Sequence, residues 1–385
     1  HVLPLHRIVR SANRFILHIG TGNPVNRHGK GVPVAIDEEI KARPTVRGIT
    51  VRIQIQVHPV CAVVHNDVLR AFHQKIQVVL ILRHLRIRKI VAPGTVDIAD
   101  TTKEELSKMM VGRDVSLEVS KSPATPGENI MTVTDLTVAS GTHKKVNAVK
   151  NISFNVKAGE IVGIAGIDGN GQSELVHAIT GLVKPKSGRI ELCGTDISKA
   201  SVRKRSKTGM SHIPEDRHKH GLVLDFTLKE NMVLQRYWER DFEKLGFIKN
   251  DEIRAYSDRL IERFDVRSGE GSNSIARSMS GGNQQKAIVA REMDKEHKLL
   301  VAVQPTRGLD VGAIEFIHRQ LVEERDAGKA VLLVSYELEE VMTVPDRLLV
   351  MYEGKIVGEL DPKQITVEEL GLYMAGSKRN TGEEK

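Results

Sequence analysis

The sequence has only two cysteines, one tryptophan and few aromatic residues, which make up 4% of its 385 residues. Cys61 and Cys193 form neither a metal-ligand spacing nor a disulfide framework, which is typical of a protein in a reducing compartment. No apolar run approaches the roughly 18 to 20 residues that a membrane span needs. The first residues also lack the order of a secretory signal. We therefore expect a chain of the cytosol, long enough for two domains.

Positive charge is concentrated in the first quarter of the chain. The formal net charge is +8, and residues 1–100 hold 15 Lys and Arg against 6 Asp and Glu. The remaining residues hold 42 against 43. Eight of the 15 histidines also lie in the first quarter, without the spacing of a metal site. Such a basic segment favours nucleic-acid binding, but stacking aromatic residues are nearly absent, so no nucleic-acid partner is expected.

A stretch of 19 residues beginning at Gly94 occurs a second time near the end of the chain, beginning at Gly358. Eight residues recur at a constant offset of 264, namely Gly94, Asp97, Thr102, Glu104, Glu105, Leu106, Met110 and Gly112. Each copy reads as a strand end, a Thr N-cap and an amphipathic helix, which predicts an internal duplication with the period of one domain. Residues 94–119 are then the tail of a first domain.

Residues 1–93 are too few to hold the body of that first domain, and their composition changes abruptly at Gly94. Alternating apolar residues predict a strand over residues 50–58. The sequence otherwise leaves the fold of this atypical basic segment open. We expect residues 1–93 to be truncated or frame-disrupted.

A glycine-rich loop follows the third strand expected in the next domain. Residues 120–129 predict a linker, and strands are expected at residues 131–138, 148–156 and 160–165. The last strand enters Gly166-Ile-Asp-Gly-Asn-Gly-Gln-Ser173, and a helix is expected over residues 174–180. This is the order of a phosphate loop with Gln172 in place of Lys, so Gly166, Gly169, Asn170, Gly171 and Ser173 would cradle phosphates without the mobile cation. A structural glycine turn is the equal alternative.

A second candidate phosphate site is the stretch Ser280-Gly281-Gly282-Asn283-Gln284. Ser280 is a good N-cap, and apolar residues at helical spacing predict a helix over residues 283–293. The free N–H groups and the positive dipole end of such a helix favour an anion. The alternative is an ordinary capped surface helix.

The remaining elements predict an α/β fold. A helical stretch is expected over residues 227–264, and apolar strands are expected at residues 298–303 and 330–334, with a helix between them. Strands that alternate with helices after an early phosphate loop favour a mainly parallel sheet, here with a helical subdomain. This domain would span residues 130–377, followed by a disordered tail over residues 378–385.

Taken as a set, these motifs resemble the nucleotide-binding domain of ABC transporters. The set comprises the phosphate loop, Pro-Glu-Asp-Arg, Ser-Gly-Gly-Asn-Gln-Gln-Lys, Pro-Thr-Arg-Gly-Leu-Asp-Val-Gly-Ala and Ser-x-Glu-Leu-Glu-Glu. It most resembles the second half of the tandem ATP-binding proteins of simple-sugar and nucleoside importers. The sequences Gly-Ile-Asp-Gly-Asn-Gly-Gln-Ser and Val-Gln-Pro-Thr-Arg-Gly-Leu-Asp point to the nucleoside branch.

The resemblance implies roles for residues that match the family's motifs. Ser280, Gly281 and Gly282 would touch the γ-phosphate of ATP held by an opposite domain, followed in the signature motif by Asn283 and Gln284. Asp310 would join the two sites. Glu215 stands at the position of the Gln that senses Mg²⁺, and the surface of residues 215–226 would receive the permease's coupling helix.

Several catalytic positions of the family are replaced. Val303 stands at the position of the Asp that supports Mg²⁺, Gln304 at that of the catalytic Glu and Tyr336 at that of the switch His. Since phosphoryl transfer depends on positioning and charge neutralisation, we expect the domain's own phosphate loop not to hydrolyse ATP. No residue is therefore assigned as catalytic or as a metal ligand.

By this resemblance, the chain is the ATP-binding component of an ABC importer for nucleosides or simple sugars. ATP and Mg²⁺ would bind at a composite site with another nucleotide-binding domain. Its partners would be transmembrane permease subunits and, indirectly, an extracellular solute-binding protein, at the cytoplasmic face of the plasma membrane. The alternatives are a non-functional transporter fragment and a regulatory or nucleic-acid-binding protein. The sequence leaves open which solute is transported and whether the chain is an active ATPase.

Overall fold

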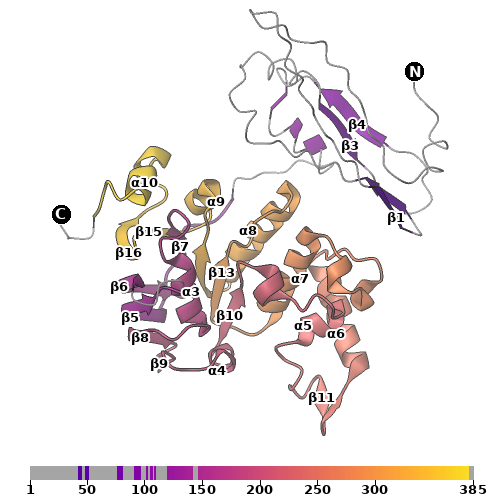
Figure 1. The fold of residues 1–385 in the computed structure, drawn as a ribbon, viewed down its shortest axis with the longest axis horizontal. Helices are drawn as coiled ribbons and strands as arrows, with labels where there is room; N and C mark the ends of the chain where they lie inside the picture. Colours follow the sequence, from indigo (N-terminus) through magenta and orange to yellow (C-terminus); the bar gives the residue numbers. More distant parts are fainter. Residues whose placement is uncertain are drawn as a thin grey trace, which may run out of the picture. The chain divides into compact units, whose positions relative to one another are not determined.

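The computed structural model describes residues 119–141 and 146–380 together with several short stretches. These stretches are residues 42–45, 48–51, 76–80, 91–96, 101–102, 105–106 and 108–109. The chain divides into two units, which are described separately: His1–Val78 with Gly94–Asp100, and Val79–Pro93 with Thr101–Lys385. Figure 1 shows the described helices and strands.

The early part of the chain contains two small sheets. β1 (Ala42–Thr45) and β2 (Gly48–Val51) are antiparallel, with Ala42 opposite Val51. β3 (Ile76–Leu80) and β4 (Val91–Val96) form the other sheet. The strand predicted over residues 50–58 overlaps β2 only at its start, and the rest of it lies outside the described residues. The expectation that residues 1–93 are truncated also falls mostly on residues outside the described part.

The second unit is built on a six-stranded sheet in the order β10-β13-β14-β7-β15-β16. Its strands are β7 (Glu160–Ala165), β10 (Met210–Ile213), β13 (Leu299–Val303), β14 (Ala330–Val334), β15 (Arg347–Tyr352) and β16 (Lys355–Leu360). All neighbours are parallel except β15 and β16. β7, β13 and β14 are buried along their whole length, as continuous apolar runs predict for central parallel strands. The mainly parallel α/β fold is confirmed.

A four-stranded antiparallel sheet in the order β6-β5-β8-β9 accompanies the parallel one. Its strands are β5 (Asn129–Ala139), β6 (Asn147–Lys157), β8 (Ser187–Leu192) and β9 (Thr195–Asp196). The two strands predicted here are confirmed and are longer than predicted. The apolar residues of β5 and β6 pack in one cluster with Val301 and Val303, whereas Leu300 and Ala302 belong to a cluster on the opposite face of β13. The alternating direction of side chains along a strand explains this division.

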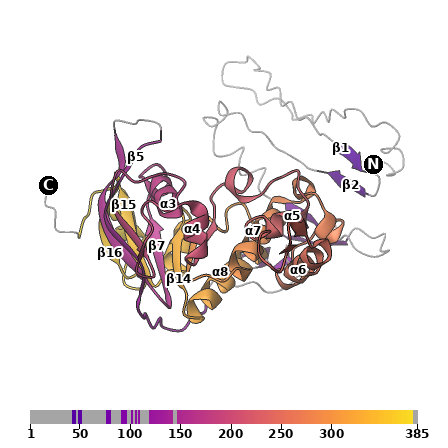
Figure 2. The same cartoon turned by 90° about the horizontal axis from the view of Figure 1, so that it is seen from below.

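Helices cover the sheet and form a separate lobe. The helices nearest the sheet are α3 (Gln172–Thr180), α4 (Val202–Lys207), α8 (Val311–Asp326), α9 (Leu338–Thr343) and α10 (Val367–Met374). The helical subdomain contains α5 (Leu228–Val233), α6 (Asn250–Arg263) and α7 (Gly281–Asp294). Figure 2 shows these three helices together at one end of the unit. Short turns of helix are η4 (Arg217–Gly221), η5 (Gly271–Asn273) and η6 (Ala276–Ser278). No helix among the described residues is long and apolar enough to cross a membrane.

The prediction of one helical stretch over residues 227–264 is wrong in its middle. A hairpin of β11 (Glu243–Lys244) and β12 (Phe247–Ile248) separates α5 from α6. Leu245 and Gly246 both have positive φ, of 55° and 87°, which no α-helix contains. Two successive residues of this kind form the tight turn of a two-residue hairpin.

Two segments predicted to be irregular are bound to the domain. Residues 119–128 contain neither helix nor strand, but the Lys121 ammonium donates to the carbonyl oxygens of Val344 and Pro345, each at 2.7 Å, and to Asp346 at 3.0 Å. At the other end, Asn380 exchanges hydrogen bonds with the backbone of Glu359 in β16. The predicted disorder is therefore wrong for residues 378–380, and residues 381–385 lie outside the described part.

The two copies of the sequence repeat begin their helices in the same way. The Thr102 hydroxyl accepts from the Glu105 backbone N–H at 3.2 Å, and the Thr366 hydroxyl accepts from that of Glu369 at 3.2 Å. The backbone N–H of Leu106 donates to Thr102, and that of Leu370 donates to Thr366. The predicted Thr caps are confirmed in both copies.

Candidate functional site

The predicted phosphate loop joins β7 to α3. Gly171 is the N-cap of α3 with φ of 102°, and a Cβ there would collide with the carbonyl oxygen of Ala148. Gly169 also has positive φ, of 89°, but faces open space. These conformations favour glycine, because side chains seldom adopt positive φ. The backbone thus has the strand, glycine loop and helix order that the sequence predicts.

Gln172 folds back into this loop. Its side chain is 1% exposed, and Nε2 donates to the carbonyl oxygen of Ile167 at 3.2 Å. Oε1 is buried and has no hydrogen-bond partner among the described residues. The position that would supply a mobile cation therefore supplies a neutral amide whose donor is already used within the loop.

Ser173, Glu215 and Tyr336 meet beside the loop. The Ser173 hydroxyl donates to Glu215 at 3.2 Å, and the other oxygen of Glu215 lies 3.4 Å from the Arg307 guanidinium. Burial raises the pKa of Tyr336 to about 12; a hydrogen bond with Ser173 opposes this, and the Glu215 and Asp168 carboxylates add to it. Among the described residues, no group of three potential metal ligands has a geometry that would hold an ion. Val303 offers no side-chain oxygen ligand at this corner, whereas the Ser173 hydroxyl and the Glu215 carboxylate each carry one.

Gln304 occupies the end of β13 in a strained conformation. Its φ is 48°, its side chain is 3% exposed, and its backbone N–H donates to Val334 at 2.8 Å. The side-chain Nε2 is buried without a partner in the described part of the chain. An amide cannot accept a proton from water as a carboxylate can, so this position provides no general base.

The second candidate phosphate site is intact and exposed. Ser280 is the exposed N-cap of α7, and its hydroxyl accepts from the backbone and side chain of Asn283 at 3.4 and 2.9 Å. The predicted helix is confirmed and extends over Gly281–Asp294. Gly281 and Gly282 are half-buried. Their backbone and the Ser280 hydroxyl are thus positioned to meet an anion supplied from outside.

Gln284 differs from its neighbours in this motif because it points inward. It is 5% exposed, its Nε2 donates to Ala276 at 2.9 Å, and its Oε1 lies 2.9 Å from His218 Nε2. Gln284 therefore connects the start of α7 to η4 and η6.

Asp310 and the signature motif lie on neighbouring segments. Asp310 is exposed and caps α8 by accepting from the Ala313 N–H at 2.9 Å. A Cβ at Gly282 would stand 3.7 Å from Leu309, the residue before Asp310. The structure therefore brings the segment containing Asp310 next to the exposed end of α7.

Comparison with known proteins agrees with this geometry. A family model described as ABC transporter matches residues 149–307. The guanosine import ATP-binding protein NupO of Bacillus subtilis (strain 168) is 50% identical over 291 residues, which are 76% of this chain and 56% of NupO. The nucleoside import ATP-binding protein NupA of Lactococcus lactis subsp. cremoris (strain MG1363) is 44% identical over 360 residues, 91% of this chain and 69% of NupA. This chain belongs to the ABC transporter ATP-binding proteins.

The chain thus spans between about half and two thirds of the length of these ABC relatives. The match to NupA covers more of the chain than residues 94–385 provide, so it extends into the first 93 residues. A structural comparison supports the ABC fold. The structure of the ADP conformation of MJ1267, an ATP-binding cassette of an ABC transporter, superposes with a TM-score of 0.52 at 20% identity, covering 65% of this chain and 96% of that one.

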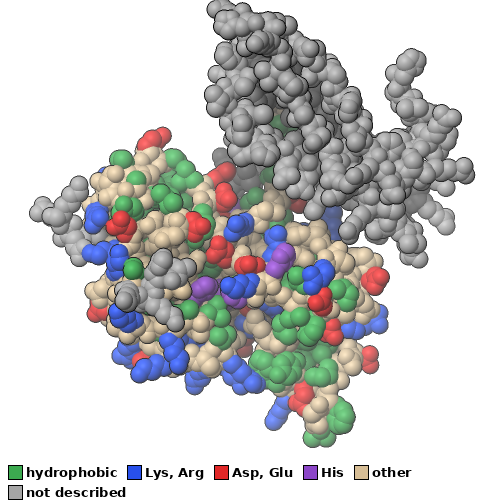
Figure 3. Space-filling view, viewed as in Figure 1, with side chains coloured by type: hydrophobic (Ala, Val, Ile, Leu, Met, Phe, Trp, Pro, Cys, Tyr) green, Lys and Arg blue, Asp and Glu red, His purple; other side chains and the backbone are tan. Residues whose placement is uncertain are grey.

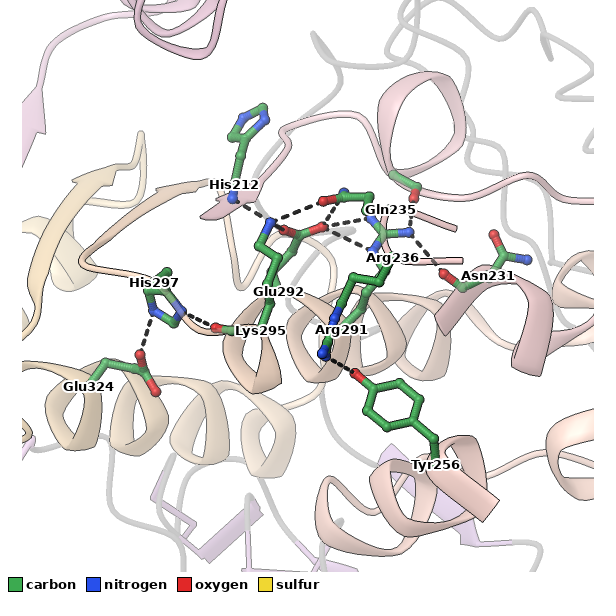
Figure 4. A network of polar contacts seen from close by, with 11 residues as sticks. His212, Asn231, Gln235, Arg236, Tyr256, Arg291, Glu292, Lys295, His297 and Glu324 are labelled. Carbon is green, nitrogen blue, oxygen red and sulfur yellow. Dashed lines mark hydrogen bonds and ion pairs between the residues drawn. The ribbon is translucent and has the colours of Figure 1, made fainter. Parts of the chain in front are cut away.

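A buried carboxylate in the ABC domain was not singled out from the sequence. Glu292 of α7 accepts from Gln235 at 2.7 Å, from Arg291 at 2.9 Å, from Lys295 at 3.1 Å and from the His212 backbone N–H at 3.3 Å (Figure 4). Burial alone would raise the pKa of Glu292, but the Lys295 and Arg291 charges outweigh it and hold the pKa at about 2. This carboxylate joins the signature helix to β10, the strand that leads to Glu215. The spacing of Glu292 and Lys295 was a readable signal, whereas Gln235 and His212 are distant in sequence.

Proposed function

We propose that this chain is the ATP-binding component of an ABC importer and that its signature helix completes an ATP site whose phosphate loop belongs to another nucleotide-binding domain. The observation that carries this proposal is the contrast between its two candidate phosphate sites. The Ser280 helix start is exposed and capped as the motif requires, whereas Gln172 is folded into its own loop.

The domain's own phosphate loop is proposed to be non-hydrolysing. Four positions that would neutralise charge or activate water carry Gln172, Val303, Gln304 and Tyr336. Losing one such group commonly lowers a rate by about 10² to 10⁴, and the losses do not simply add. The contacts of Ser173 with Glu215 and Tyr336 further occupy the corner where a metal would be needed.

Nucleosides are the proposed solute class, ahead of simple sugars. Both NupO and NupA are named for the import of guanosine or nucleosides. In this proposal the permease and an extracellular solute-binding protein select the solute. The chain would act at the cytoplasmic face of the plasma membrane as a peripheral subunit.

The permease is proposed to dock near Glu215 and Phe226. Val223 and Phe226 are 37% and 43% exposed, and they follow the η4 turn between the sheet and the helical subdomain. Exposed apolar side chains between two lobes suit a docking partner. Glu215 would link this surface to the phosphate loop through its bond with Ser173.

An internal duplication is proposed for residues 94–119 and the end of the ABC domain. The matching caps of Thr102 and Thr366 support it. The eight residues that recur at a constant offset of 264 support it as well. Under this proposal residues 120–129 connect the two repeats, although Lys121 is bound to the second one.

The test is ATP hydrolysis by this chain with a complete first nucleotide-binding domain and the permease. The chain alone is expected to hydrolyse no ATP above background. In the assembly, Ser280→Ala is expected to lower turnover by about 10² to 10³, the usual cost of losing a donor to a transition-state oxygen. Ser278→Ala is the matched control, because Ser278 is a neighbouring exposed serine whose hydroxyl donates to the carbonyl oxygen of Ile275. If the chain alone hydrolyses ATP and Ser280→Ala abolishes this activity, the chain associates with a second copy of itself, and the proposal is wrong.

A further inference from the structure

The segment from Gln304 to Asp310 connects β13 to α8 and contains turns but neither helix nor strand. Within it, the backbone N–H groups of Arg307 and Leu309 donate to Gln304 and Thr306, each at 3.2 Å. These turns shape the segment but do not attach it to the neighbouring helices. Its position relative to the start of α7 therefore depends on side chains from other elements.

Gln285 attaches the segment to the signature helix. This residue lies on α7, is 3% exposed, and donates from Nε2 to the carbonyl oxygen of Pro305 at 3.0 Å. A buried hydrogen bond of this length fixes both the distance and the direction between its two partners. The backbone at Pro305 thus has a defined position relative to the helix that Ser280 caps.

Glu340 attaches the next residue to two further helices. Oε1 of Glu340, on α9, accepts from the Thr306 hydroxyl at 2.8 Å. His318 of α8 places Nε2 2.8 Å from the same oxygen. None of these three residues is more than 5% exposed. Because Asp310 caps α8, Glu340 contacts both the segment and the helix that follows it.

The cluster around Glu340 has a cost that points to a role in orientation. Figure 3 shows acidic side chains spread over the described surface of one face, where water solvates them, whereas Glu340 is 2% exposed. Oε2 of Glu340 and Nδ1 of His318 are buried without a hydrogen-bond partner among the described residues. Leaving such atoms unpaired costs free energy that apolar side chains would not cost. Hydrogen bonds are directional and apolar contacts are not, so the cluster is suited to orienting the segment.

We propose that Gln285, Thr306 and Glu340 are positioning residues that hold Asp310 at a fixed place beside the signature motif. They act through the segment and not on a nucleotide. Leu309 of the same segment already lies beside Gly282. This inference rests on the proposed composite ATP site, because only there would Asp310 meet another nucleotide-binding domain.

The experiment uses the chain assembled with a complete first nucleotide-binding domain and the permease. Thr306→Val keeps the shape of the side chain and removes its hydroxyl, so kcat is expected to fall about tenfold or more, the usual loss for a hydrogen bond to a charged group. KM for ATP should change little, because the other domain's phosphate loop would hold the nucleotide. Thr306→Ser retains the hydroxyl and should retain kcat. Gln285→Met removes the bond to Pro305 and should lower kcat as Thr306→Val does. Thr343→Val is the matched control, since the Thr343 hydroxyl donates to the carbonyl oxygen of Glu339 within α9.

Amide hydrogen exchange in the chain alone tests the same contact without the composite site. Thr306→Val should raise exchange at residues 307–310 about tenfold, because the segment opens locally more often, and Thr306→Ser should not. Circular dichroism verifies that each variant is folded.

Three outcomes would overturn the inference. One is unchanged exchange at residues 307–310 in Thr306→Val. Another is an equal loss of kcat in Thr306→Ser and Thr306→Val, which would assign the effect to packing. The last is an unchanged kcat in Thr306→Val while Ser280→Ala lowers turnover, which would leave the composite site standing without this role. If Ser280→Ala has no effect either, the composite site itself is wrong, and this inference falls with it.

Discussion

The hydroxyl of Ser173 donates a hydrogen bond of 3.2 Å to the carboxylate of Glu215. In a metal-dependent phosphate site this hydroxyl would be free to face the cation. Here the Ser173 hydroxyl is bonded to Glu215, which lies two residues before the η4 turn. The Tyr336 hydroxyl contacts Ser173 as well. The phosphate loop and the segment of the proposed permease-docking surface are therefore joined by one short polar link.

Restoring a cation to the phosphate loop should restore nucleotide affinity. Gln172→Lys replaces a neutral amide bound to Ile167 with an ammonium that reaches phosphate oxygens. Such charge-assisted bonds contribute about 1.5–3 kcal/mol, so the dissociation constant for a fluorescent ATP analogue should fall at least about tenfold. Gln172→Met, which removes the amide and keeps the length of the side chain without adding a charge, is the control. If the two variants bind the ATP analogue with equal dissociation constants, the missing lysine charge is not what limits nucleotide binding at this loop.

The stability of the domain should decline in mild acid because of His212. Burial holds the pKa of His212 at about 4, below the 6.5 of a solvated imidazole. Between these values the unfolded chain binds a proton that the native chain excludes, so the free energy of unfolding falls as pH drops from 6.5 to 4. The difference amounts to about 3 kcal/mol.

His212→Gln tests this contribution, since it keeps the backbone N–H that binds Glu292. Denaturant unfolding between pH 6.5 and 4.5 should give a shallower slope for the variant than for the native chain. This range lies above the one in which Glu292 acts, because the native pKa of Glu292 is about 2 and its stabilisation is lost as pH falls from 4.5 toward that value. Parallel slopes would contradict the prediction.

Neutralising Glu292 should destabilise the ABC domain. Glu292→Gln preserves size but leaves Arg291 and Lys295, which are 3% and 8% exposed, without their common anion. Breaking a buried ion network by removing one partner costs about 3–5 kcal/mol, measurable by chemical denaturation. Glu296→Gln, at an exposed position four residues later, should change stability by no more than about 0.5 kcal/mol. If Glu292→Gln lowers the free energy of unfolding as little as the control does, the ion network around Glu292 does not stabilise the domain.

The central strands were predictable because their signal is local. Glu160–Ala165 and Ala330–Val334 are short continuous apolar runs, and only burial on both faces satisfies them. The Ser280 helix was predictable for the same reason, since its cap and apolar spacing lie within one segment. The helical stretch failed at Leu245, because a leucine with positive φ gives no turn signal in the sequence.

The candidate sites depend on contacts that no local pattern contains. The sequence shows that Gln172 replaces a lysine, but not that its amide turns back to Ile167. A cavity beside α3 is lined by His177 of α3, His212 of β10 and Lys219 of η4, which are distant in sequence and are brought together by the fold. The sequence shows Glu292 directly beside Arg291. The partner that links Glu292 to β10 is the backbone N–H of His212, which is 80 residues away.

Lys121 binds the carbonyl oxygens of Val344 and Pro345, at the C-terminal end of α9. The opposite end of that helix follows directly after Tyr336, whose hydroxyl reaches Ser173. The residues that hold Lys121 and the residue that contacts Ser173 beside the phosphate loop are thus connected by one helix of six residues, so the anchoring of the segment at Lys121 and the shape of the loop share a single short element.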